Sequence, residues 1–199
     1  MQQDTPITYA ISTSGFAHLN LPECLRKAAQ LGYEGVEAAY HDLFSFRRGP
    51  TQRYLEDAEI RQDSVTDEIL AAQAHYGTRV TGVHGPVIPL NAPDWAARDW
   101  INHEAFRRMH RLGAATFTVH AGSGTVKDLN AELPTIEAHL ESLADLGDAY
   151  GITICVESGC MPYEIRTIPE LAGLLSRHGT PTPRPGKRRC QTPPTSRPT

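Results

Sequence analysis

The sequence predicts an α/β fold in which short β-strands alternate with helices around a parallel sheet. The main observation is a repeat: a helical pattern ends at a glycine, and a short β-prone segment follows. Glycine at this position adopts the left-handed conformation that ends a helix without steric cost. Strands that alternate with helices pair in parallel, because each helix returns the chain to the same end of the sheet. The four glycines of this repeat are Gly32, Gly77, Gly113 and Gly151.

Five strands separated by four helices are predicted, with a fifth helix after the last strand. Asn20 with Glu23, and Thr167 with Glu170, have the capping-box spacing that marks a helix start. The fifth helix spans Ile168–His178 and ends at Gly179. The predicted strands are Ile7–Ser12, Gly35–Ala39, Arg79–Val83, Thr116–Val119 and Ile152–Val156.

Periodicity alone does not distinguish an open doubly wound sheet from a closed barrel. No GxGxxG follows the first strand and no GxxxxGK[ST] occurs in the chain, so the best signals of nucleotide-binding open sheets are missing. The strand ends carry polar residues instead. The first strand ends in Ser12–Gly15 and the second in Tyr40–Asp42, while the next three end in His84, His120 and Glu157.

Two histidines and a carboxylate at the ends of three successive parallel strands would converge on one face. Imidazole and carboxylate groups both suit zinc or manganese, so His84, His120 and Glu157 form a candidate metal half-site. Glu157 is the strongest candidate, since a carboxylate after an apolar strand is costly to bury without a positive partner. The alternative is that each histidine has a structural role. Glu37 either contacts substrate or makes a structural hydrogen bond.

Several of these segments resemble the signatures of the xylose-isomerase-like barrel superfamily. Val83–Pro86, Val119–Gly122 and Val156–Ser158 are similar to its third, fourth and fifth strand ends, and Leu21–Tyr40 to its first helix and second strand. The resemblance spans roughly Ile7 to Gly179. It implies a (β/α)8 TIM barrel, of which about five strand–helix units are present.

The resemblance implies a metal-dependent sugar or sugar phosphate isomerase or epimerase. Glu157 would bind a divalent metal (Mn, Mg, Co or Zn) and move a proton, so that a small sugar or polyol reacts through an enediolate. His84 and His120 would complete the metal ligands present, and Glu37 and His84 would contact substrate.

Two alternatives remain open at this point. In the endonuclease IV branch of the superfamily the third- and fourth-strand histidines bind zinc, which implies an abasic-site phosphodiesterase with His84 and His120 as ligands. The second alternative is that the chain is an inactive remnant, or a subunit that needs a partner. The family pattern continues with further ligands, beginning with Asp-x-x-His, and none of these follows Gly179.

The last twenty residues differ in composition from the rest of the chain. They contain six prolines and no Val, Ile, Leu, Met or aromatic residue, which is typical of disorder. We therefore expect a partial barrel over residues 1–179 and a disordered tail over 180–199, rich in Pro, Arg and Thr. The tail is either a natural extension or the product of a truncation or frameshift, and the missing ligands favour the second.

Charge and hydropathy indicate which kinds of partner and which cellular location to expect. The net charge is −4, but five basic and no acidic residues lie in the tail, which leaves 14 basic and 23 acidic residues and a charge of −9 in the body. DNA-binding bodies usually carry the opposite charge, so we expect no nucleic-acid partner. There is no membrane span and no signal peptide, so we expect a cytoplasmic protein. The open edges of a five-strand arc favour self-association.

Overall fold

The computed structural model describes residues 9–16, 18–45, 62–85, 90, 95–120, 129–157 and 173. The chain forms two compact units. The first contains Met1–Pro86 and Ile101–Ala115, and the second contains Val87–Trp100 and Thr116–Thr199. The predicted capping box at Thr167 and the tail over 180–199 lie outside the described residues, as does the predicted helix Ile168–His178 apart from Gly173.

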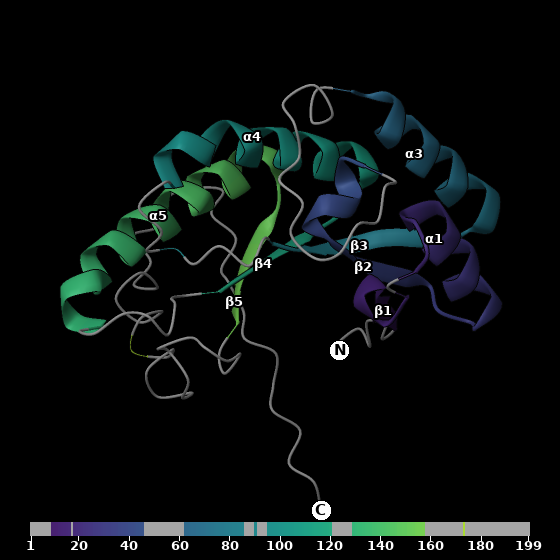
Figure 1. The fold of residues 1–199 in the computed structure, drawn as a ribbon, viewed down its shortest axis with the longest axis horizontal. Helices are drawn as coiled ribbons and strands as arrows, with labels where there is room; N and C mark the ends of the chain where they lie inside the picture. The colour runs from purple at the N-terminus through teal and green to yellow at the C-terminus, as the bar shows by residue number, and fades with distance from the viewer. Residues whose placement is uncertain are drawn as a thin grey trace, which may run out of the picture. The chain divides into compact units, whose positions relative to one another are not determined.

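The first unit contains three strands that pair in parallel in the order of the chain (Figure 1). Ala10 lies opposite Gly35, which in turn lies opposite Arg79. The register shifts between Val36 and Glu37, which marks a bulge in the second pairing. The elements are β1 (Ala10–Ser12), the 3-10 turn η1 (Thr13–Phe16), α1 (Leu21–Gln30), β2 (Gly35–Ala39), the 3-10 turn η2 (Tyr40–Leu43), α3 (Ser64–Tyr76) and β3 (Arg79–His84).

The predicted start of α1 is confirmed. The Asn20 side chain accepts a hydrogen bond from the Glu23 amide at 3.0 Å, and the Glu23 carboxylate accepts one from the Asn20 amide at 2.9 Å. Together these two bonds satisfy amides that the first helical turn leaves without partners. Pro22 stands in the same turn, where a missing N–H costs nothing.

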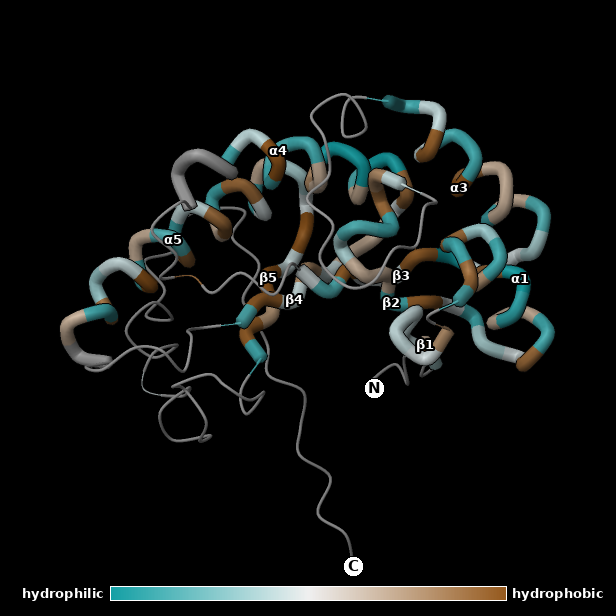
Figure 2. Tube along the Cα trace, viewed as in Figure 1, coloured by the Kyte–Doolittle hydropathy of each residue, from teal (hydrophilic) through white to brown (hydrophobic). Residues whose placement is uncertain are grey.

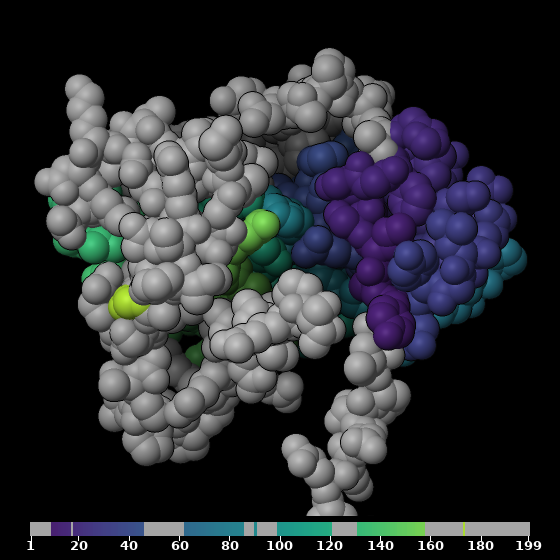
Figure 3. All heavy atoms as spheres, turned by 90° about the horizontal axis from the view of Figure 1, so that it is seen from below, coloured from purple at the N-terminus to yellow at the C-terminus, as the bar shows by residue number. Residues whose placement is uncertain are grey.

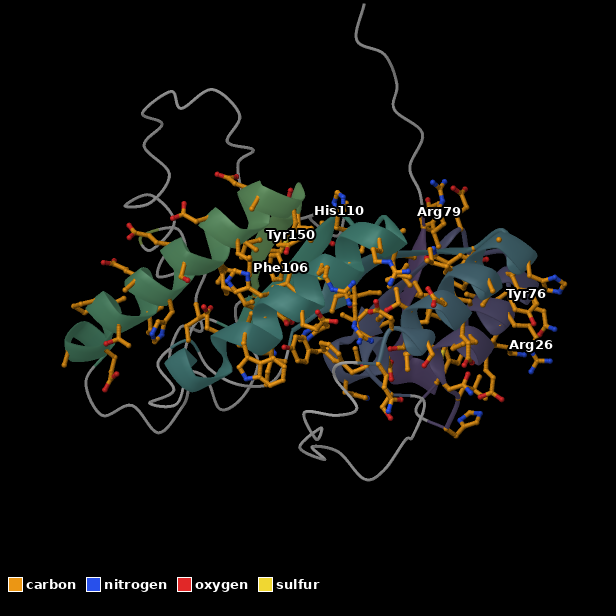
Figure 4. The ribbon with its side chains drawn as sticks, turned by 90° about the horizontal axis from the view of Figure 1, so that it is seen from above. Arg26, Tyr76, Arg79, Phe106, His110 and Tyr150 are labelled. Atoms are coloured by element: carbon orange, nitrogen blue, oxygen red, sulfur yellow. The ribbon has the colours of Figure 1, made fainter. Side chains whose placement is uncertain are left out.

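The core of the first unit lies between its strands and its helices. Val36 and Val80 lie in register and are fully buried, as are Leu25 of α1 and Ile69 of α3. Figure 2 shows the hydrophobic colour concentrated on β2 and β3. Figure 4 shows Arg26 and Tyr76 pointing outward from α1 and α3. The edge strand β1 is less covered: Ala10 is exposed, and Figure 3 shows N-terminal atoms, in purple, at the surface.

The second unit contains two parallel strands, β4 (Thr116–His120) and β5 (Thr153–Glu157), and the helix α5 (Leu129–Tyr150). The helix packs against β5 at Gly147, where an added Cβ would lie 2.5 Å from the Ile152 carbonyl oxygen. A glycine is therefore required for this helix and strand to approach so closely. The helix α4 (Trp95–Leu112) begins in the second unit and ends in the first.

The predicted α/β fold is confirmed, with small differences at the strand ends. All four predicted helix-ending glycines have left-handed backbone conformations, with φ between 70° and 81°. The strands β3, β4 and β5 each end one residue later than predicted, so His84, His120 and Glu157 are the last residues of their strands. Two predicted starts are wrong: β5 begins at Thr153 and not at Ile152, and Tyr9 lies outside β1, which begins at Ala10. Among the helices in the described part of the chain, none is long and apolar enough to cross a bilayer.

Candidate metal and active site

His120 and Glu157 meet at the carboxyl ends of two neighbouring strands in the second unit. They are direct partners in the β4–β5 register, and His120 Nδ1 lies 3.7 Å from Glu157 Oε2. The imidazole is buried, with 3% of its side chain exposed, whereas the carboxylate is 42% exposed. The pair therefore combines a buried imidazole nitrogen with a carboxylate that reaches the solvent.

Strand alternation explains why these two side chains share a face. Phe117 and Val119 of β4, and Ile154 and Val156 of β5, are the buried apolar positions of the two strands. His120 and Glu157 each follow the last of these positions, so both side chains lie on the opposite face of the ladder. An apolar pattern of period two thus places imidazole and carboxylate side by side.

The other two predicted site residues belong to the first unit. His84 ends β3 and is half-buried, and its Nδ1 lies 3.3 Å from the Gly85 carbonyl oxygen. Glu37 is a half-buried residue of β2, between the fully buried Val36 and Ala38. Glu37 therefore lies on the face of β2 opposite to the buried apolar one.

A second polar group, formed by Thr13, His41 and Asp42, stands at the carboxyl ends of β1 and β2. The Thr13 hydroxyl donates to Asp42 Oδ2 at 3.0 Å and accepts from the Ala39 amide at 3.0 Å. Asp42 is only 1% exposed, and its Oδ1 lies 3.3 Å from Nε2 of the 54% exposed His41 ring. The sequence marked both strand ends as polar, but it assigned no role to these residues.

Arg108 is a fully buried arginine that the sequence analysis did not identify. Its Nη1 donates to the Leu43 carbonyl at 2.8 Å, its Nη2 to the Gln62 carbonyl at 3.0 Å, and its Nε to Glu104 at 2.9 Å. The available signal was its position in the apolar stripe of α4, between Ala105 and Leu112. An arginine in such a stripe is desolvated and needs hydrogen-bonding partners.

Around Arg108, an ion-pair network lowers the pKa values of two carboxyl groups, Glu104 and Asp63. Burial raises the pKa of Glu104, but hydrogen bonds from Arg107 and Arg108 outweigh this and hold it below its usual value. The hydrogen bond from Arg107 lowers the pKa of the exposed Asp63. The same two carboxylates raise the pKa of Arg107. These groups form a network within one face of the first unit.

The donor atoms of the three predicted ligands are of the kinds that bind divalent transition metals. In the second unit His120 offers an imidazole nitrogen and Glu157 a carboxylate oxygen, and in the first unit His84 offers an imidazole nitrogen. Mixed nitrogen and oxygen ligands are typical of zinc, manganese, iron and cobalt sites, whereas magnesium and calcium prefer oxygen alone. The chemistry of the residues is therefore compatible with the predicted metal, and it favours the borderline ions over magnesium.

Comparisons with solved structures show the same fold at low identity. A D-psicose 3-epimerase from Clostridium cellulolyticum H10, crystallised with D-tagatose, has a TM-score of 0.64 and 17% identity over 86% of this chain and 60% of its own. The IOLI protein, solved with a zinc atom, has a TM-score of 0.66 and 13% identity over 87% and 59%. An AP endonuclease of family 2 from Brucella melitensis has a TM-score of 0.59 and 22% identity over 85% and 64%.

The match of a family model extends through most of the sequence. This chain spans less than two thirds of the length of each of those three solved chains. A comparison with curated proteins found no match. Residues 25–183 match the model described as a xylose isomerase-like TIM barrel. The chain therefore belongs to the xylose isomerase-like TIM-barrel family, and its fold is of the (β/α)8 type.

Proposed function

We propose that this protein is a metal-dependent isomerase or epimerase of a small sugar or sugar phosphate, acting by proton transfer through an enediolate. The observation that carries the proposal is the pairing of a buried imidazole, His120, with an accessible carboxylate, Glu157, at the ends of two adjacent parallel strands. In (β/α)8 enzymes the groups that react with substrate stand at these strand ends.

In this proposal His84, His120 and Glu157 hold the ion, and Glu157 is also the base. A divalent ion bound there would polarise a substrate carbonyl and the neighbouring hydroxyl, which acidifies the C–H bond between them. Glu157 then takes that proton, because its carboxylate is the accessible member of the pair. Glu37 and His84 contact substrate hydroxyls. The acidic body of the chain suits a small polyol better than a nucleic acid.

Metal binding is the first test of the site. The purified protein is titrated with Mn²⁺, Co²⁺, Zn²⁺ and Mg²⁺ in separate calorimetric experiments. We expect one ion to bind per chain, and we expect Glu157→Gln and His120→Ala each to weaken binding at least tenfold, as loss of a ligand usually does. Glu68→Gln, an exposed carboxylate on α3, is the matched control. Equal binding by Glu157→Gln and Glu68→Gln would contradict the ligand assignment.

Proton exchange tests the chemistry separately. A panel of ketoses is incubated with the metal-loaded protein in D2O, and proton NMR records the loss of the signal next to the carbonyl. Exchange is expected with the wild type and with Glu68→Gln, and is expected to be lost in Glu157→Gln. If the metal binds but no ketose exchanges a proton, the site holds an ion without this reaction.

An abasic-site phosphodiesterase is the second candidate, and the presence of two imidazoles favours it. Zinc binds imidazole well, and His84 and His120 supply two such ligands. This activity predicts zinc-dependent cleavage of a duplex oligonucleotide that contains one abasic site, lost in His120→Ala. The acidic body of the chain opposes binding to a phosphate backbone.

Self-association is proposed from the sheet edges. In the described part of the chain, β1 pairs only with β2 and β5 only with β4. An open strand edge presents backbone groups to which another chain can add. Light scattering after size exclusion should detect dimers or larger species. The opposite result would be a monomer that binds no metal and whose measured properties do not change in Glu157→Gln. That result would indicate a chain without activity of its own.

A further inference from the structure

The buried guanidinium of Arg108 connects three elements of the first unit. It donates to Glu104 within α4, to the carbonyl of Leu43 at the end of η2, and to the carbonyl of Gln62 just before α3. A planar guanidinium presents five N–H donors in a fixed fork, whereas the lysine ammonium has three donors on a rotatable group and an apolar side chain has none. Both carbonyls belong to the connection between β2 and α3, Leu43 near its start and Gln62 near its end.

The same guanidinium also fixes the aromatic residue after η2. It lies over the Phe44 ring, 4.9 Å from its centroid. The Phe44 ring meets the Tyr40 ring edge-on, with centroids 5.3 Å apart. The Tyr40 hydroxyl lies 3.5 Å from Oδ1 of Asn102, one and a half turns before Arg108 on α4. Both ends of η2 are therefore held against α4.

Between these two ends lie His41 and Asp42. Asp42 is held on its other side by the Thr13 hydroxyl at 3.0 Å, and the exposed ring of His41 lies 3.3 Å from the Asp42 carboxylate. The carbonyl of His41 accepts the amides of Phe44 at 3.1 Å and Ser45 at 3.2 Å. The position of the imidazole thus depends on a short turn that is fixed from the strand side by Thr13 and from the helix side by Arg108.

We propose that Arg108 is a positioning residue that fixes the turn η2 and, through it, the His41 imidazole at the carboxyl end of β2. An apolar side chain would fill the same volume without the desolvation that a buried charge requires. What the arginine adds is directed hydrogen bonding to two carbonyls and a contact with Phe44. It acts through Leu43 and Phe44 and does not touch the imidazole itself. This inference is independent of the proposed metal site.

The test compares His41 in three variants of the whole chain. Arg108→Met removes the donors but keeps the apolar stem. Arg111→Met removes an arginine of the same helix whose contacts with Asp63 and Asp67 are at the surface. Ile69→Ala is a core variant of the same unit, in α3, and is expected to lower stability by creating a cavity. For each, ¹H–¹⁵N spectra of the histidine rings and hydrogen exchange of individual amides are recorded, together with the free energy of unfolding.

In Arg108→Met we expect the ring signals of His41 to move toward those of a free imidazole. The Phe44 and Ser45 amides should exchange at least tenfold faster than in Ile69→Ala at equal global stability. Both effects should be absent from Arg111→Met. The proposal is overturned if Arg108→Met only lowers stability, with His41 and the two amides behaving as in Ile69→Ala.

A second variant covers the case in which Arg108→Met does not fold. Phe44→Leu keeps an apolar side chain but removes the ring that lies between Arg108 and Tyr40. It should shift the His41 ring signals in the same direction by a smaller amount. Unchanged His41 signals in a folded Phe44→Leu protein would equally overturn the proposal.

Discussion

The carboxylates of Asp42 and Glu157 stand at the ends of two different strands, in opposite environments. Asp42 is 1% exposed and accepts a 3.0 Å hydrogen bond from Thr13. The Glu157 side chain is 42% exposed and lies 3.7 Å from a buried imidazole, which is too long for a good hydrogen bond. A buried, hydrogen-bonded carboxylate maintains the structure around it, whereas the carboxylate of Glu157 reaches the solvent. The same carboxylate chemistry is thus enclosed in the first unit and exposed to solvent in the second.

The comparison is tested most directly by removing the hydroxyl that holds Asp42. Thr13→Val keeps the shape of the side chain but removes both the donor to a buried carboxylate and the acceptor of the Ala39 amide. We expect a loss of about 2–3 kcal/mol in the free energy of unfolding, measured by urea denaturation. Glu157→Gln should change it by less than about 0.5 kcal/mol, as for other accessible sites. Equal losses in the two variants would break the comparison.

The next largest change in the free energy of unfolding is expected in the second unit, where α5 packs on β5. Gly147→Ala places a Cβ 2.5 Å from a backbone oxygen, which cannot move without displacing the strand. We expect a loss of about 2 kcal/mol in urea denaturation. Gly15→Ala is the control, because an added Cβ there meets nothing within 4 Å. A Gly147→Ala protein as stable as the control would show that the helix and strand are not in close contact.

The first unit contains a smaller effect at Gln73. Its side-chain oxygen accepts the Val80 amide at 2.7 Å and its nitrogen donates to the Leu112 carbonyl at 3.2 Å, so one amide joins β3 to the end of α4. Gln73→Ala should cost about 1–2 kcal/mol, because the buried Val80 amide loses its side-chain partner. Gln73→Glu keeps the acceptor and loses only the donor, so it should be less harmful. The reverse order would show that the bond to Leu112 is the stronger of the two.

The smallest expected effect is the pH dependence from Glu104. Burial raises the pKa of Glu104, but hydrogen bonds from Arg107 and Arg108 outweigh this and hold the pKa below its usual value in the folded state. A lowered carboxyl pKa adds stability that is fully present above the unfolded-state value and is lost as the pH falls through the folded one. Urea midpoints measured from neutral pH downward should therefore fall less steeply in the acidic range, at and below the ordinary pKa of a glutamate, in Glu104→Gln than in the wild type. If the urea midpoints of the two proteins changed with pH in parallel, Glu104 would contribute nothing to the pH dependence of stability.

Residue patterns were sufficient for much of the fold. Gly32, Gly77, Gly113 and Gly151 marked helix ends correctly, because a left-handed residue without a Cβ is a local requirement. The strand β2 was predicted with its observed bounds, Gly35–Ala39. The ends of β3, β4 and β5 were each placed one residue too early, because local pattern cannot show where a ladder to a neighbouring strand ends.

For the candidate site, residue patterns were enough to predict that His120 and Glu157 end successive strands, since strand–helix alternation puts the carboxyl ends of parallel strands together. Only the tertiary structure decided that His120 is buried while Glu157 stays accessible, because burial depends on residues distant in the chain. The same holds for Arg108. Its place in the apolar stripe of α4 was visible in the sequence, but its carbonyl partners at Leu43 and Gln62 come from chain segments that only folding brings to the helix.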